Sequence, residues 1–153
     1  MISFEGVPAV YFNSLFGKAN DEAKYVITGN NRDVNRYKWN YKNITKKLSD
    51  KNSKQSIFYQ NLGKLLEIKR KQKAFHPNAK RLNINLGSKL FCFKRISVDK
   101  KQTIISITNC SSITQYPKLD KKYGKWKNII NPKINSLKKS LRLKPFETMW
   151  LSN

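Results

Sequence analysis

The sequence predicts an α+β chain in which a strand, a long polar loop and one helix precede a small antiparallel β-sandwich. Three observations predict this order. A short apolar run beside glycine and proline, residues 7–12, is typical of a strand buried on both faces. A helical apolar period begins at Ser56. After Pro77, turn residues recur about every eight to twelve positions between short apolar segments, as in antiparallel sandwiches.

The first predicted strand runs through Val7, Val10 and Phe12 without polar alternation. A strand buried on both faces needs a neighbour on each side, and the few residues before it cannot supply one. We therefore expect the chain to begin inside a larger fold; the alternative is a core strand of a small mixed domain. Without its neighbours we expect the strand to leave its side chains exposed. Each exposed side chain then forgoes the roughly 1.5–3 kcal/mol that its burial would contribute to stability.

Residues 18–54 form a long polar segment with no strong period, and we predict a loop there. Loops of this length in compact domains are usually functional or disordered. Tyr37, Trp39 and Tyr41 occupy alternate positions, and such aromatic content argues against disorder. The loop is therefore a candidate site, placed at the C-terminal end of the first strand.

The predicted helix follows a capping residue, which is Asp50, Asn52 or Ser53. It ends near residues 72–75, before Pro77. Its apolar residues fall at helical spacing at Phe58, Leu62, Leu65 and Leu66. The strands predicted after Pro77 comprise residues 82–86, 90–96, 103–108, 113–116, 126–130, 141–143 and 146–151.

The charge of the chain is strongly positive, with 32 basic and 9 acidic residues and a formal net charge of +23. Such a charge is typical of nucleic-acid or anionic-surface binding. Only 6 of the 32 basic residues are arginine, however, and the lysines are spread along the whole chain. Because arginine is the residue that suits phosphate geometry, solvated surface lysine is the favoured interpretation and nucleic-acid binding the alternative.

Other classes of protein are excluded by the remaining composition. Two cysteines, Cys92 and Cys110, are too few for a disulfide framework or a zinc cluster, and we expect reduced, packed thiols. His76 has no metal-ligand spacing around it, so we expect no metal and no cofactor. No apolar run is long enough to span a bilayer and no signal-peptide pattern is present, which predicts a cytoplasmic protein without a membrane partner.

Several motifs resemble glycoside hydrolase family 13, the α-amylase clan, and within it the sucrose phosphorylase and glucosylglycerate phosphorylase branch. The clan's G-x-P-x-x-Y signature is matched in residues 6–11, and the branch pattern T-G-x-N-R-x-[IV]-N-R in residues 28–36. Further similarity lies in residues 14–16, 20–21, 72–79, 143–146 and 150–151. Asn30 and Asp33 depart from the glucosylglycerate-type loop, which leaves the sugar acceptor open.

The resemblance implies the end of a (β/α)8 barrel in residues 1–78 (last strand, substrate loop and last helix) and a C-terminal β-domain in residues 79–153. It implies retaining glucosyl transfer between a glucoside and phosphate. The carboxylate nucleophile and acid of that chemistry come from earlier barrel strands in the family, and none of this chain's acidic residues matches a catalytic position. We expect no catalytic residue here, no activity of the chain alone, and a partner that supplies the missing N-terminal part of the barrel.

The candidate substrate- and phosphate-binding residues are Arg32, Asn31 and Asn35. The resemblance places Arg32 in the loop after the eighth strand, and loops after strands seven and eight commonly bind phosphate in these barrels. A guanidinium can donate two parallel hydrogen bonds to phosphate. The alternative is a structural ion pair of Arg32 with Asp33 or Asp21. For the aromatic residues of the loop, sugar stacking and packing of the loop are both open, and packing is favoured.

Overall fold

The computed structural model of the chain describes residues 2–120, 126–132 and 141–153. These residues form two compact units, one comprising Met1–Pro8 with Glu67–Asn153 and the other Ala9–Leu66. We call them the sheet unit and the helical unit. The division falls inside the longest helix, and the first eight residues belong with the C-terminal half of the chain rather than with the residues that follow them.

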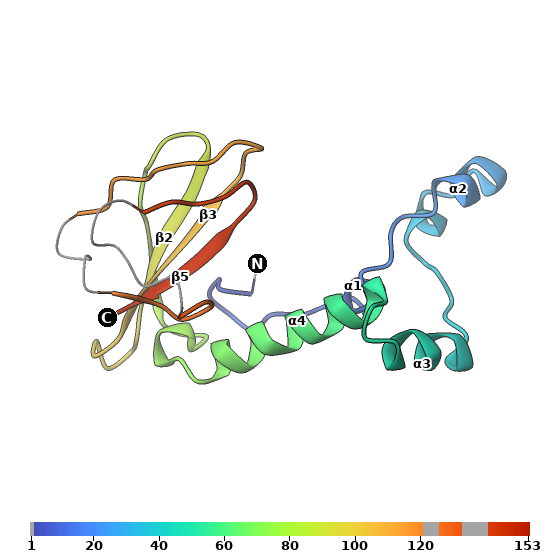
Figure 1. Ribbon diagram of the computed structural model, residues 1–153, viewed down its shortest axis with the longest axis horizontal. Coiled ribbons are helices and arrows are strands. Elements are labelled where there is room, and N and C mark those ends of the chain that lie inside the picture. Colours follow the sequence, from blue (N-terminus) through green and yellow to red (C-terminus); the bar gives the residue numbers. More distant parts are fainter. Residues whose placement is uncertain (1, 121–125, 133–140) are drawn as a thin grey trace. The chain divides into compact units, whose positions relative to one another are not determined.

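The sheet unit contains a five-stranded antiparallel sheet in the order β1-β2-β3-β5-β4. Figure 1 shows β2, β3 and β5 side by side in this sheet. Antiparallel pairing was predicted and is confirmed, and β2 and β3 lie where the alternation placed them. The strands are β1 (Lys80–Asn83), β2 (Leu90–Ile96), β3 (Thr103–Asn109), β4 (Lys127–Asn128) and β5 (Thr148–Ser152).

The second sheet that a sandwich requires is not formed by the described residues. The strands predicted at residues 113–116 and 141–143 contribute one isolated bridge, between Gln115 and Leu143. These segments instead bring Leu141 and Leu143 onto one face of the sheet, over Ile105, Ile107 and the other members of a buried cluster. The two segments thus bury their apolar side chains as a layer of loops. Each segment has too few residues with a paired backbone to form a second sheet.

The opposite face of the sheet is covered by residues from before the first strand. The 3-10 helix η2 (Lys73–Phe75) places Phe75 on Trp150 in a T-shaped contact, with ring centroids 4.7 Å apart. Phe4 packs on Phe93 at 5.2 Å. This aromatic layer explains why the first residues of the chain fold with the sheet unit.

The helical unit corrects the prediction of a loop over residues 18–54. It holds the short helices α1 (Phe12–Leu15), α2 (Glu22–Thr28), η1 (Asn31–Val34) and α3 (Tyr41–Ser49), followed by the start of α4 (Lys54–Arg70). Local caps define them. The Asp21 carboxylate accepts from Lys24 N at 3.1 Å and the Asn40 side chain accepts from Asn43 N at 3.2 Å. Such caps stabilise short helices, which a long apolar period does not reveal.

The strand predicted over residues 7–12 is not formed by the residues that the structure describes. Residues 7–11 belong to no strand, and α1 begins at Phe12. No hydrogen bond joins residues 7–10 to any other residue that the structure describes. Val7 is 83% exposed and Phe12 is 57% exposed, as expected for this strand without its neighbours. The physical reason is that strand geometry needs a paired backbone, which the described residues do not provide here.

Helix α4 confirms the predicted helix and its cap. The Ser53 hydroxyl accepts from Ser56 N at 3.0 Å, and Lys69 and Arg70 lie in the last turn, where positive charge suits the helix dipole. The predicted apolar face is less buried than its period suggests, because Phe58 remains 44% exposed.

The two cysteines differ in burial, which corrects the expectation of two packed thiols. Cys92 is buried in β2, and Cys110 is exposed. Burial raises the pKa of the Cys92 thiol to about 12. We expect an alkylating reagent at pH 8 to modify Cys110 alone in the folded protein and both thiols after denaturation, since the thiolate is the reactive form. Mass spectrometry of the alkylated protein measures this, and rapid labelling of native Cys92 would contradict the burial.

Candidate functional site

Arg32 lies in η1, in a turn held together by its own neighbours. The Asn30 side chain accepts from Arg32 N at 3.1 Å, and the Asn30 carbonyl accepts from Asp33 N at 2.9 Å. Gly29 ends α2 in the left-handed conformation, with φ of 65°, immediately before this turn. The backbone around Arg32 is therefore defined by local hydrogen bonds, and its side chain is exposed.

The guanidinium of Arg32 forms no ion pair with Asp21 or Asp33 among the described residues. Asp21 is used instead as the cap of α2, and its backbone N–H donates to the Val34 carbonyl at 2.7 Å, which ties the two ends of the α2–η1 segment together. This arrangement leaves the Arg32 side chain available to an external anion. Its role in binding stays a prediction.

The two predicted asparagines differ in what they contribute. Asn31 is exposed at the start of η1. Asn35 follows η1, and its backbone carbonyl accepts two hydrogen bonds, from Asn13 Nδ2 at 2.8 Å and from the Tyr11 hydroxyl at 3.2 Å. The carbonyl of Asn35 thus fixes the loop, while a role of either side chain in ligand binding stays a prediction.

Asn13 is the residue that sequence reasoning missed. It is 5% exposed, and its Nδ2 donates to the carbonyls of Asn35 and Tyr37 at 2.8 and 3.2 Å. Its Oδ1 accepts from Trp39 Nε1 at 2.9 Å. One side chain in α1 therefore anchors the segment that follows Arg32 at three points. An asparagine in a chain rich in asparagine carries no sequence signal for such a role.

Of the three aromatic residues of the loop, Tyr37 and Trp39 pack within the helical unit, as the packing interpretation predicts, and Tyr41 does not. Trp39 packs against Phe16 and Tyr37 in T-shaped contacts, with ring centroids 5.8 and 4.9 Å apart. Lys18 Nζ lies 4.5 Å from the centre of the Tyr37 ring. Tyr41, by contrast, is 81% exposed.

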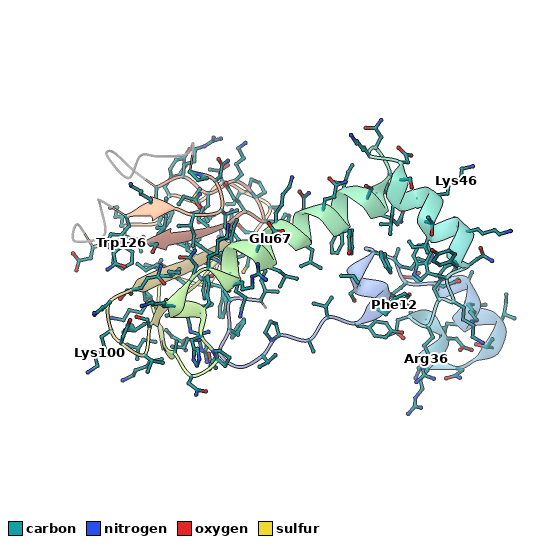
Figure 2. The ribbon with its side chains drawn as sticks, turned by 90° about the horizontal axis from the view of Figure 1, so that it is seen from below. Phe12, Arg36, Lys46, Glu67, Lys100 and Trp126 are labelled. Carbon is teal, nitrogen blue, oxygen red and sulfur yellow. The ribbon has the colours of Figure 1, made fainter. Side chains whose placement is uncertain are left out.

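Figure 2 shows the Arg36 side chain extending outward from the helical unit.

Glu5, which immediately precedes the matched G-x-P-x-x-Y signature of residues 6–11, has a structural partner. Its Oε2 lies 2.7 Å from Arg81 Nε, at the start of the sheet unit. A backbone hydrogen bond within Glu5 and the bond from Arg81 hold the pKa of this carboxyl below its ordinary value. A carboxylate held ionised by an arginine is suited to an ion pair and unsuited to donating a proton.

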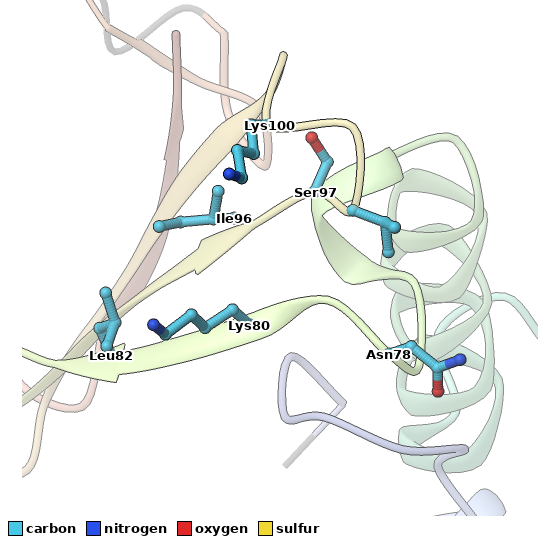
Figure 3. Close-up of a pocket in the computed structure, with 7 residues that line it drawn as sticks. Asn78, Lys80, Leu82, Ile96, Ser97 and Lys100 are labelled. Atoms are coloured by element: carbon cyan, nitrogen blue, oxygen red, sulfur yellow. The ribbon is translucent and has the colours of Figure 1, made fainter.

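The sheet unit contains a separate surface cavity of about 440 Å³. It is lined by the apolar residues Leu82, Ile96 and Val98 and by the lysines Lys80 and Lys100. Figure 3 shows Ile96 between the two lysine side chains. None of the predicted site residues lines this cavity.

Within the described residues, no group of three or more His, Cys, Asp or Glu side chains is arranged to hold a metal ion. The helices that the structure describes include none with the length and apolar character needed to cross a membrane.

Comparison with known proteins gives related sequences and related folds. No protein-family model matches the chain. The glucosylglycerate phosphorylase of Escherichia coli (strain K12) is 28% identical over 151 residues, which cover 99% of this chain and 26% of the E. coli protein. That of Spirochaeta thermophila is 30% identical over 115 residues, covering 75% of this chain and 20% of the relative. The chain thus spans about a quarter or less of these curated relatives.

Among solved structures, a maltogenic amylase from S. marinus is similar over 99% of this chain and 18% of its own length, with a TM-score of 0.64 and 21% identity. At that identity the likeness concerns the fold alone. The sequence matches confirm the resemblance predicted from the motifs: the chain is related, over almost its whole length, to the glucosylglycerate phosphorylase branch of glycoside hydrolase family 13.

Proposed function

We propose that this chain is the C-terminal portion of a sucrose or glucosylglycerate phosphorylase-like enzyme, and that it supplies the acceptor- and phosphate-side loop. In this proposal residues 7–12, which form no strand in the described structure, become the last strand of a (β/α)8 barrel once the rest of the enzyme supplies a partner backbone. The α2–η1 segment is the substrate loop, and α4 is the last barrel helix. The single observation that carries the proposal is the sequence match to a glucosylglycerate phosphorylase, which covers 99% of this chain at 28% identity. The T-G-x-N-R-x-x-N-R run lies inside the matched region.

Arg32 is the proposed phosphate-binding residue. Its support is an exposed guanidinium without an ion pair among the described residues, on a backbone fixed by Asn30 and by the Asn13 anchor. A cation held on a rigid loop binds an anion at a lower entropic cost than one on a mobile loop. Asn31 and Asn35 are proposed as weaker contributors to the same site, through their side-chain amides.

The chemical step itself is assigned to groups outside this chain. Retaining glucosyl transfer uses a nucleophilic carboxylate and an acid about 5–5.5 Å apart. We assign neither role to any of the nine acidic residues of this chain. The chain would bind and orient phosphate, or the glucoside's acceptor group, on one side of a centre that the rest of the enzyme completes.

A chimera tests this proposal. The matched portion of the E. coli relative is replaced by this chain, and phosphorolysis of glucosylglycerate and of sucrose is measured as release of glucose 1-phosphate. We expect turnover from the chimera and none from the chain alone. A folded chimera that binds substrate but turns over neither sugar would refute the proposal, and the preferred sugar identifies the acceptor.

Within an active chimera, Arg32→Ala is expected to raise the KM for phosphate about tenfold or more, because a charge-assisted, two-point contact is lost. The free energy of unfolding of the variant chain in urea should differ by less than about 0.5 kcal/mol from that of the parent, since Arg32 is exposed and has no ion pair to lose among the described residues. Arg142→Ala, at another exposed arginine, is the matched control. A large loss of stability in Arg32→Ala with an unchanged KM would instead support the structural ion pair.

The alternative function is nucleic-acid binding. Its only support is the net charge of +23, since no specific contact among the described residues points to it. A gel-shift titration at low and high salt measures it directly, because such binding weakens steeply as salt rises.

A further inference from the structure

The helical unit exposes a cluster of aromatic side chains that its own residues only half cover. Phe12 and Tyr59 both pack on the buried Phe16, with ring centroids 5.1 and 5.8 Å from it. Phe58 lies over Gly17, the residue that follows Phe16 in the chain. Their exposed fractions are 57% for Phe12, 44% for Phe58 and 45% for Tyr59. Because these rings share contacts around α1, they form one surface, which we call the α1–α4 aromatic patch.

The backbone just before this patch, at Ala9 and Val10, also lacks hydrogen-bond partners among the described residues. Residues 9–11 are outside any strand, and neither Ala9 nor Val10 has a hydrogen bond to another described residue. An apolar segment with unpaired N–H and C=O groups can join the edge of another sheet through main-chain hydrogen bonds. The segment therefore offers main-chain pairing next to aromatic side chains that would be buried by it.

A second apolar surface lies on α2, where Val26 is 80% exposed and Ile27 is 84% exposed. The structure buries no residue of α2. Exposed apolar groups of this size, when contiguous, mark interaction surfaces. The helical unit as described thus leaves its apolar groups uncovered at both α1 and α2.

Charge narrows the choice of partner. Residues 9–66 contain 11 basic and 4 acidic residues, so the helical unit carries a net charge of +7. Two copies of this unit would repel each other at a shared apolar patch. An acidic surface around an apolar centre would be complementary.

We propose that the α1–α4 aromatic patch and the unpaired backbone of Ala9 and Val10 form the docking surface for a second polypeptide. This partner presents an open strand edge with an acidic rim, and it corresponds to the part of the glucosylglycerate phosphorylases that this chain does not match. The identity of the partner rests on the proposed function. The position of the surface rests on exposure, missing backbone hydrogen bonds and charge.

Calorimetry and gel filtration test the proposal, with a fragment of the E. coli relative that lacks the matched portion as the probe. We expect a 1:1 complex whose Kd increases with salt, because the charges are complementary. Phe12→Asp should raise the Kd about tenfold or more. Phe146→Asp is the matched control, since Phe146 is 70% exposed in the sheet unit and its φ of 56° suits aspartate. The control should leave the Kd unchanged.

The main-chain part of the surface has its own pair of variants. Ala9→Pro removes one N–H and should raise the Kd about fivefold, whereas Ala9→Ser keeps the N–H and should not. Circular dichroism of each variant alone establishes that it is folded. Failure to form a complex, a complex that neither Phe12→Asp nor Ala9→Pro weakens, or a homodimer that the fragment does not dissociate would overturn the proposal.

Activity of the complex separates this inference from the proposed function. A complex that shows the expected variant effects but no phosphorolysis would leave the docking surface established and refute the enzymatic proposal. An active chimera together with no association of the separate pieces would do the reverse.

Discussion

Replacing Arg95 with methionine is expected to destabilise the sheet unit by about 3 kcal/mol, one of the two largest effects that we predict for a single substitution. Arg95 is fully buried in β2. Its guanidinium donates to the carbonyls of Ser3, His76 and Ala79 at 3.0, 2.8 and 3.1 Å. Methionine fills a similar apolar volume but leaves these acceptors without their donor, and each buried unsatisfied group costs about 1–3 kcal/mol.

The consequence for the fold is specific, because these carbonyls belong to two segments that cover the same face of the sheet. One is the N-terminal residues 3–4, and the other is the connection from η2 to β1. Burial lowers the pKa of Arg95, and the nearby carboxylate of Glu5 opposes that shift. Loss of the guanidinium should therefore release the N-terminal residues from the sheet before the sheet itself unfolds.

Urea denaturation followed by circular dichroism measures the free energy of unfolding, and hydrogen exchange at residues 3–6 and 76–79 measures the local release. Arg142→Met is the control, because Arg142 is exposed in the same unit. A loss in Arg95→Met no larger than in the control would mean that water can replace the guanidinium at all three carbonyls.

Arg95 also marks a limit of sequence reasoning about this fold. Lysine and arginine are usually solvated, so an arginine inside an apolar strand of a chain with 32 basic residues attracts no attention. The strands around it were predictable, because β2 and β3 combine alternation with β-branched residues such as Ile105 and Ile107. The use of Arg95 depends on carbonyls more than fifteen residues away along the chain, and no local pattern specifies that.

The helical unit shows the opposite limit. Its helices α2 and α3 are set by Asp21, Asn40 and a terminal Gly29, which are caps of modest energy that a search for apolar periods cannot weigh. The strand predicted at residues 7–12 failed for a different reason. Its composition suits a buried strand, but strand structure depends on a partner backbone, and composition cannot show whether the described residues provide one.

The candidate site was predictable as a sequence motif and not as a geometry. The T-G-x-N-R-x-x-N-R pattern located Arg32, and the structure adds that its loop is fixed by Asn30 and by Asn13. Asn13 lies outside that pattern, fifteen residues before its start at Thr28. A buried amide with three long-range partners is invisible to motif reasoning, because the partners are two backbone carbonyls and an indole that any sequence could offer.

The second large effect is expected at this position. Asn13→Ala should destabilise the helical unit by about 2 kcal/mol, because the carbonyls of Asn35 and Tyr37 and the Trp39 indole N–H lose their common partner. We expect faster hydrogen exchange over residues 35–39 and a red shift of tryptophan fluorescence. Asn20→Ala, at an exposed asparagine of the same unit, is the matched control.

Asn13→Asp separates the donor from the acceptor. The aspartate keeps an oxygen for the Trp39 indole but, when ionised, places a second oxygen against the Asn35 and Tyr37 carbonyls. Burial and these carbonyls should raise its folded pKa above the ordinary value of about 3.9. The variant should therefore be least stable relative to the parent above its folded pKa and recover as pH falls through it, since the protonated acid regains an O–H donor. In the active chimera, Asn13→Asp should also raise the KM for phosphate at neutral pH. If residues 35–39 exchange no faster in either variant than in Asn20→Ala, Asn13 is not the anchor of the Arg32 loop.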